Sequence, residues 1–203
     1  MDENGLIQTS TEAEQAAGTT GSLYVVDGRA SRFTAQVFAS GMLAKMGHNP
    51  TIAVRDISGR VSFDPEIREA HDFKILVKAA SLNVQNDVSD KDRREIERIM
   101  NQEVLEVVKF PEIRYEAVSV PVTKVSDMLY SAALDGELTL HGITQREPIS
   151  ARVTLLGSML RASGHLALHQ SDYGIKPVSV AGGVLKVKDE LKLSFEIVAR
   201  RQE

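Results

Sequence analysis

The chain has 203 residues, of which 42% are hydrophobic and 26% are charged, and its formal net charge is -4. The absence of cysteine excludes disulfides, thiolate metal sites and cysteine nucleophiles, and the negative charge leaves no basic stripe for a nucleic-acid backbone. No apolar run reaches the length of about eighteen residues that a membrane-spanning helix requires. Neither a nucleic-acid partner nor a transmembrane segment is therefore expected.

The first segment, residues 1–22, is polar and acidic, and it lacks the basic start and apolar middle of a secretory signal. Its composition predicts a disordered tail, which precedes one domain over residues 23–203. Without a signal peptide a cytoplasmic location is expected, and a periplasmic one would follow if a signal had been removed.

The first half of the domain predicts short strands. Apolar and polar residues alternate at Phe33–Val37 and at Phe73–Val77, and Leu23–Asp27 is rich in residues that favour strands. Between residues 41 and 51 the alternation stops, and Gly47 and Pro50 indicate a bend.

One helix is predicted after residue 88. Ser89 is a suitable N-cap, and Asp90 and Asp92 occupy the first turn, where the helix dipole favours acids. Apolar positions then recur at intervals of three and four residues, at Ile96, Ile99, Met100 and Val104. The helix is expected to end before Phe110, which Pro111 follows.

The region from Leu134 to Ala199 shows the clearest pattern. Apolar and polar residues alternate in Leu134–Leu140, Ile149–Leu155, Leu160–Leu168 and Leu191–Ile197. A period of two predicts strands, because successive side chains point to opposite faces of a sheet. Four such runs predict an antiparallel meander with one dry face.

These elements predict a mainly all-β protein with about eight or nine antiparallel strands and one or two short helices. The last strands, Val184–Lys188 and Leu191–Val198, flank Asp189-Glu190 and predict a tight hairpin. A sheet that is dry on one side closes into a barrel or folds into a sandwich. The interior of a barrel of about eight strands either fills with side chains or holds one slender ligand.

Three segments, in a fixed order, resemble a known family. They are REIERIMNQEVLEVVKFPEIRYEAV (residues 94–118), LDGELTLHGIT (134–144) and HQSDYGIKPVSVAGGVLKVK (169–188), and the stretch 41–59 accompanies them. Together they resemble the YceI-like family, whose members are lipocalin-like antiparallel barrels that bind polyisoprenoids or other long-chain lipids and amides. The resemblance covers residues 23–199 and implies a lipocalin-like β-barrel of about eight strands around an extended lipid.

The resemblance implies binding, sequestration or transport of an isoprenoid or other long-chain amphiphilic lipid, without a catalytic residue, metal or cofactor. Such a chain needs a dry, elongated cavity, and each buried methylene contributes about 0.8 kcal/mol. Two alternatives remain open: an enzyme for an apolar substrate with His48 or His141 as the base, and an interaction module with a filled barrel. Exposed strand edges and the resemblance also allow a homodimer, because a strand edge can pair with a second copy of the chain.

The residues expected to form the wall of the lipid site lie on the dry face or in the flexible stretch after residue 41. They are Phe33, Val37, Met42, Leu43, Met46, Phe73, Ile75, Val77, Tyr115, Leu138, Leu140, Leu166, Leu168, Phe195 and Ile197. Polar contacts at the ends of the tube are expected from His48, Tyr130 and Tyr173.

The other histidines have simpler interpretations. His141 precedes Gly142, so a hydrogen bond that fixes a turn is expected there. His165 and His169 are expected on one strand, where a separation of four residues places them about 13 Å apart. One metal ion cannot bridge that distance, and no metal site is predicted.

Overall fold

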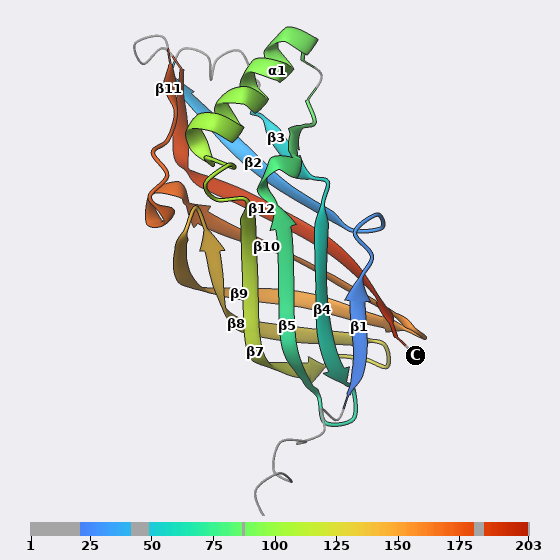
Figure 1. Cartoon of the computed structure of the whole chain (residues 1–203). Coiled ribbons are helices and arrows are strands. Elements are labelled where there is room, and N and C mark those ends of the chain that lie inside the picture. Colours follow the sequence, from blue (N-terminus) through green and yellow to red (C-terminus); the bar gives the residue numbers. More distant parts are fainter. Residues whose placement is uncertain (1–20, 42–48, 87, 181–184, 203) are drawn as a thin grey trace, which may run out of the picture.

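The computed structural model describes residues 21–41, 49–86, 88–180 and 185–202. Its strands form one antiparallel sheet, and eight of them close into a barrel because β12 pairs with both β10 and β1 (Figure 1). In spatial order these eight are β1 (Ser22–Val26), β4 (Ile57–Asp64), β5 (Glu69–Lys78), β7 (Glu112–Lys124), β8 (Leu129–Leu140), β9 (Ile143–Leu156), β10 (Met159–His169) and β12 (Leu185–Arg201). The predicted eight-stranded antiparallel barrel is confirmed.

Further elements cover one end of the barrel. The strands β2 (Arg32–Gly41), β3 (Thr51–Val54) and β6 (Leu82–Val84) continue the sheet from β12, and β11 (Ser179–Val180) pairs with the start of β12. The helical segments are α1 (Asp90–Ile99), the π-helical turn η3 (Met100–Val104) and the 3-10 turns η2 (Ala79–Ser81) and η4 (Gln170–Tyr173).

The barrel has two different ends (Figure 1). We call the end beneath α1 the helix end, and the opposite end, where residues 65–68 and 125–128 connect strands, the turn end. Residues 1–20 of the predicted tail lie outside the described ranges, and Ser22 already belongs to β1. Within those ranges, no helix is long and apolar enough to cross a bilayer.

The alternation in the sequence places every second side chain in the core. In β8 the alternate residues Tyr130, Ala132, Leu134, Gly136 and Leu138 are buried, and the residues between them are exposed. Each buried apolar side chain contributes about 1.5–3 kcal/mol relative to an exposed one. The dry face predicted from the period of two is therefore the inner wall of the barrel.

The predicted helix is confirmed at its start. The Ser89 hydroxyl accepts a hydrogen bond from the Asp92 N–H at 3.2 Å, so it caps α1. Two side chains of α1 then bind the outer edge of β6: Glu97 Oε1 accepts from the Val84 N–H at 3.0 Å, and Arg93 donates to the Val84 carbonyl. These contacts satisfy backbone groups of an edge strand that would otherwise be open.

The strand β12 corrects one prediction. Residues 185–201 form a single strand, and Asp189-Glu190 is not a hairpin turn. Both Val187 and Leu191 pair with β2, and the register shifts between them. The interruption in the apolar pattern is therefore a bulge, which adds residues to one strand without reversing its direction.

A corner between β1 and β2 lets both strands pair with β12. The Asp27 N–H donates to the Val198 carbonyl at 2.8 Å, and the Ser31 hydroxyl accepts from the Val198 N–H at 3.0 Å. One Asp27 carboxylate oxygen accepts from the Ala30 N–H, and the other contacts Arg200 Nε at 3.1 Å. The corner thus keeps the β12 backbone paired at the point where its neighbour changes from β1 to β2.

Asp27→Asn is expected to lower the free energy of unfolding in a pH-dependent way. The hydrogen bond from Arg200 and the Ala30 N–H hold the pKa of the Asp27 carboxyl below its ordinary value. Because the folded pKa is lower, this stabilisation is complete above the unfolded pKa of about 3.9 and is lost as the pH falls through the folded pKa. Urea denaturation should show a difference between wild type and variant near neutral pH that shrinks in acid. A pH-independent difference would contradict a role for the charge.

Candidate functional site

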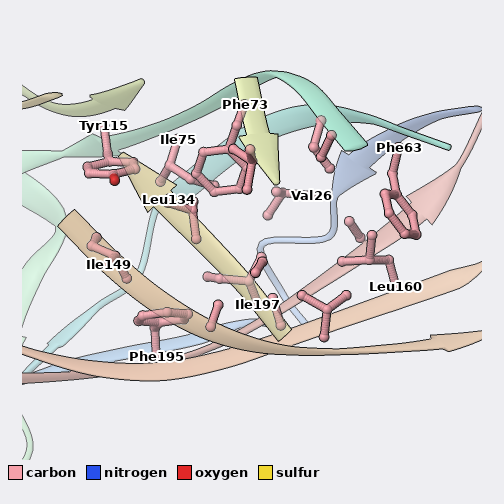
Figure 2. Close-up of a pocket in the computed structure, with 18 of the residues that line it drawn as sticks. Val26, Phe63, Phe73, Ile75, Tyr115, Leu134, Ile149, Leu160, Phe195 and Ile197 are labelled. Atoms are coloured by element: carbon pink, nitrogen blue, oxygen red, sulfur yellow. The ribbon is translucent and has the colours of Figure 1, made fainter. Parts of the chain in front are cut away.

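The interior of the barrel contains an apolar cavity of about 110 Å³ (Figure 2). Twenty-two residues from nine strands line it, and all are apolar except Tyr115 and the exposed Arg60. Side chains from β4, β5 and β7 face side chains from β9, β10 and β12 across the space (Figure 2). The cavity can therefore hold an apolar group, and no polar atom of its lining faces the space.

Aromatic side chains close the cavity at the turn end. Phe63 is 2% exposed and Tyr130 is 4% exposed, and their rings meet edge to face with centroids 5.5 Å apart. Tyr24 of β1 is buried as well. Phe63 and Leu160 mark one end of the space, and Tyr115, Ile149 and Phe195 mark the other (Figure 2).

Two glycines make room for aromatic rings on the inner wall. A Cβ atom on Gly164 would lie 2.6 Å from the Phe195 ring, and one on Gly136 would lie 2.6 Å from the Tyr115 ring. Because neither glycine has a side chain, both rings occupy that space on the neighbouring strand and leave the centre of the barrel open. The cavity thus depends on small residues that face large ones.

The Tyr115 hydroxyl is bound to the protein itself. It donates a hydrogen bond to the Glu147 carbonyl at 2.9 Å, and burial raises the pKa of the phenol to about 12. The residue therefore stays neutral at physiological pH and presents its ring to the cavity. Its ring also meets that of Phe73 edge to face, with centroids 5.9 Å apart.

Tyr115→Phe is expected to lower the free energy of unfolding by about 1–2 kcal/mol, because the Glu147 carbonyl loses its hydrogen-bond donor. The ring stays, so binding of an apolar ligand should be unchanged. Chemical denaturation and a ligand titration on the same samples measure the two effects. A tenfold loss of affinity at unchanged stability would show instead that the hydroxyl contacts the ligand.

The residues expected to form the wall divide into groups. Those that line the cavity are Phe33, Phe73, Ile75, Tyr115, Phe195 and Ile197. Those that belong to the packed core outside the lining are Val37, Val77, Leu138, Leu140, Leu166 and Leu168. Those that lie outside the described residues are Met42, Leu43 and Met46, together with His48.

The two tyrosines expected at the ends of the tube are both buried. Tyr130 belongs to the aromatic closure at the turn end, and Tyr173, in η4, is 1% exposed. The Tyr173 hydroxyl donates to a Glu147 carboxylate oxygen at 3.3 Å, and burial raises the pKa of this phenol above its ordinary value.

Several lining residues were not expected from the sequence. The most informative are Ala132, Ala151 and Ala162, three small residues on the dry face of neighbouring strands. Ala151 pairs with both Ala132 and Gly164, so small residues lie side by side across three strands. A run of alanine and glycine at inward positions was the available signal for empty space.

His141 fixes the turn after β8, as expected. Its Nδ1 lies 3.3 Å from the Tyr173 carbonyl and its Nε2 lies 2.8 Å from a Glu106 carboxylate oxygen. Both partners are hydrogen-bond acceptors, so each can accept from a ring nitrogen that carries a proton. The ring also packs against Phe110, with centroids 4.3 Å apart. Its nitrogens therefore connect the loop after η3 with η4.

No cluster of three or more metal-ligating side chains occurs in the part of the chain that the structure describes. His165 and His169 both lie on β10, as expected.

Comparison with known proteins identifies the family of this barrel. The family model of the YceI-like domain matches residues 24–199. The chain belongs to the YceI-like family. A UPF0312 protein of Pseudomonas savastanoi pv. phaseolicola is 30% identical over 155 residues, which cover 72% of each chain. The family resemblance of the sequence motifs is confirmed.

Solved structures show the same fold as this YceI-like chain. BcnA of Burkholderia cenocepacia superposes with a TM-score of 0.63 at 19% identity, covering 85% of this chain and 98% of BcnA. A polyisoprenoid binding domain from Saccharophagus degradans gives a TM-score of 0.62 at 18% identity, with coverages of 88% and 98%. The YCEI protein of Campylobacter jejuni gives 0.56 at 17% identity, with coverages of 75% and 85%.

Proposed function

We propose that this protein binds an isoprenoid or another long-chain amphiphilic lipid, with the apolar chain inside the barrel. The observation that carries the proposal is the almost wholly apolar cavity inside a YceI-like barrel. The polyisoprenoid binding domain of Saccharophagus degradans, which shares the fold, supports the ligand class. The role proposed is sequestration or transport, without a chemical step.

The lining defines what the ligand must look like. Apart from the exposed Arg60 and from Tyr115, whose hydroxyl is already bound to Glu147, the lining holds no polar side chain. The head group of the lipid therefore remains outside the cavity. Cavities of this size hold about one small apolar group, such as a ring. A longer chain therefore requires the side chains of the core to move apart at the helix end.

The structure of the helix end is compatible with such movement. There the core is completed by side chains from helical segments and loops, among them Met100, Leu105 and Ile175, which the strand ladder does not hold. Segments fixed by side-chain contacts open more readily than hydrogen-bonded strands.

Native mass spectrometry after gentle purification, followed by organic extraction, tests the proposal. A mass added to the chain that disappears on extraction, together with a long-chain lipid in the extract, is the expected result. The purified protein should also bind added geranylgeraniol and raise its melting temperature as the alcohol concentration rises. The proposal fails if no lipid is recovered and if neither geranylgeraniol nor a long-chain fatty acid changes the melting temperature.

A further inference from the structure

The hydrogen-bonded wall of the barrel has a break between β9 and β10. The two strands pair from Met159 opposite Leu156 to Gly164 opposite Ala151. Beyond that point, within the described residues, β9 continues to pair with β8 and β10 with β12, but not with each other. The wall near the helix end is thus open on this side.

The turn η4 fills this break. It follows directly on β10 and lies at the side of the barrel next to the start of β9, where the chain is orange in Figure 1. Its last residue, Tyr173, is almost wholly buried. Toward β9, the Tyr173 hydroxyl donates to Glu147 and the Gln145 side chain donates to the Asp172 carbonyl at 3.3 Å.

On its other side η4 is bound to β12. The Ser171 N–H and hydroxyl donate to the two carboxylate oxygens of Asp189, at 2.8 and 2.6 Å. The Gln170 side chain donates to the Lys188 carbonyl at 2.9 Å. All of these contacts use side chains, so η4 can leave without breaking a strand ladder.

The break leads to the cavity. Glu147, which holds Tyr173 through its carboxylate, holds Tyr115 through its carbonyl, and Tyr115 lines the cavity. Ile149, two residues further along β9, lines it too. The buried side chains beneath α1, such as Val84 and Met100, are absent from the lining.

We propose that the lipid enters the barrel through its side, between β9 and β10. The turn η4 closes this route, and the buried side chain of Tyr173 fills the break. The inference rests on the lipid binding proposed above and adds the route. On this route η4 returns to its place once the lipid is inside, so loosening its contacts should speed uptake and release equally and leave the affinity unchanged.

Asp189→Ala tests the route, because it removes both hydrogen bonds from Ser171 without touching the cavity. Stopped-flow fluorescence with parinaric acid, which fluoresces in an apolar site, measures uptake, and displacement by unlabelled oleate measures release. Both rates should rise by roughly tenfold, and the Kd should stay within about twofold of the wild type. This result is expected because the free-energy barrier to entry and exit falls while the free energy of binding is unchanged. Ser171→Ala, which removes one of the two bonds, should give a smaller increase.

Glu97→Ala is the matched control, since it removes one carboxylate contact that holds α1 on β6. Its uptake rate should equal that of the wild type. Unchanged rates in both Asp189→Ala and Ser171→Ala, or an equal acceleration by Glu97→Ala, would overturn the route. Failure of the wild type to bind parinaric acid, together with no effect of geranylgeraniol on its melting temperature, would instead refute the lipid binding on which the route depends.

Discussion

Ala151→Leu is expected to weaken lipid binding by at least about tenfold while the protein remains folded. Ala151 is buried, lines the cavity and pairs with Ala132 and Gly164, so a larger side chain extends into the empty space. Excluding two or three methylenes of a ligand at about 0.8 kcal/mol each costs about 2 kcal/mol of binding free energy. A titration with parinaric acid measures the loss.

The control for this prediction is Ala133→Leu on the neighbouring strand. Ala133 is exposed on the outer face of β8, so the same added atoms do not enter the barrel. It should bind like the wild type. Filling the cavity should also keep or raise the melting temperature of Ala151→Leu, because a void is replaced by contacts. Unchanged lipid binding in Ala151→Leu would place the ligand elsewhere.

The contrast between Ala151 and Ala133 shows how much of the site the sequence predicts. The period of two assigns Ala151 to the inner face, and the structure places it there, buried in the wall of the cavity. Periodicity gives the face of a residue but not the distance to the residue across the barrel. Leu138 and Leu140 have the same pattern as Leu134, yet only Leu134 lines the cavity.

The difference along β8 arises from segments distant in sequence. At the helix end the core is completed by residues such as Met100, Leu105 and Tyr173, which come from η3, from the residue that follows η3 and from η4. Toward the turn end, the strands alone form the wall, and small residues leave space between them. Which part of a barrel is filled therefore depends on tertiary packing that a strand pattern does not contain.

The predicted hairpin in β12 failed for a related reason. Asp189-Glu190 interrupts the apolar alternation, and such an acidic pair is common in turns. Here Asp189 instead binds Ser171, and the strand continues on the same neighbour after a shift of register. The partner that stabilises the interruption lies eighteen residues earlier, in η4 just after β10, so the local sequence alone favours the turn.

Phe63→Ala is expected to lower the free energy of unfolding by about 3–5 kcal/mol, which is the usual cost of removing a buried phenylalanine. Phe63 is almost fully buried, packs edge to face against Tyr130 and closes the cavity at the turn end. A loss of this size is a large part of the stability of an ordinary domain, and it should lower the melting temperature by about 10 °C. Thermal unfolding followed by circular dichroism measures it.

Phe38→Ala provides the matched control, since Phe38 is a partly exposed phenylalanine on β2 whose ring lies 5.3 Å from the Lys192 ammonium. A contact of this kind contributes about 0.5–1 kcal/mol at an exposed site, so the control should unfold close to the wild-type temperature. An equally small effect of Phe63→Ala would mean that the turn end is loosely packed. The lipid would then have a second way into the barrel, through the aromatic closure, in competition with the break between β9 and β10.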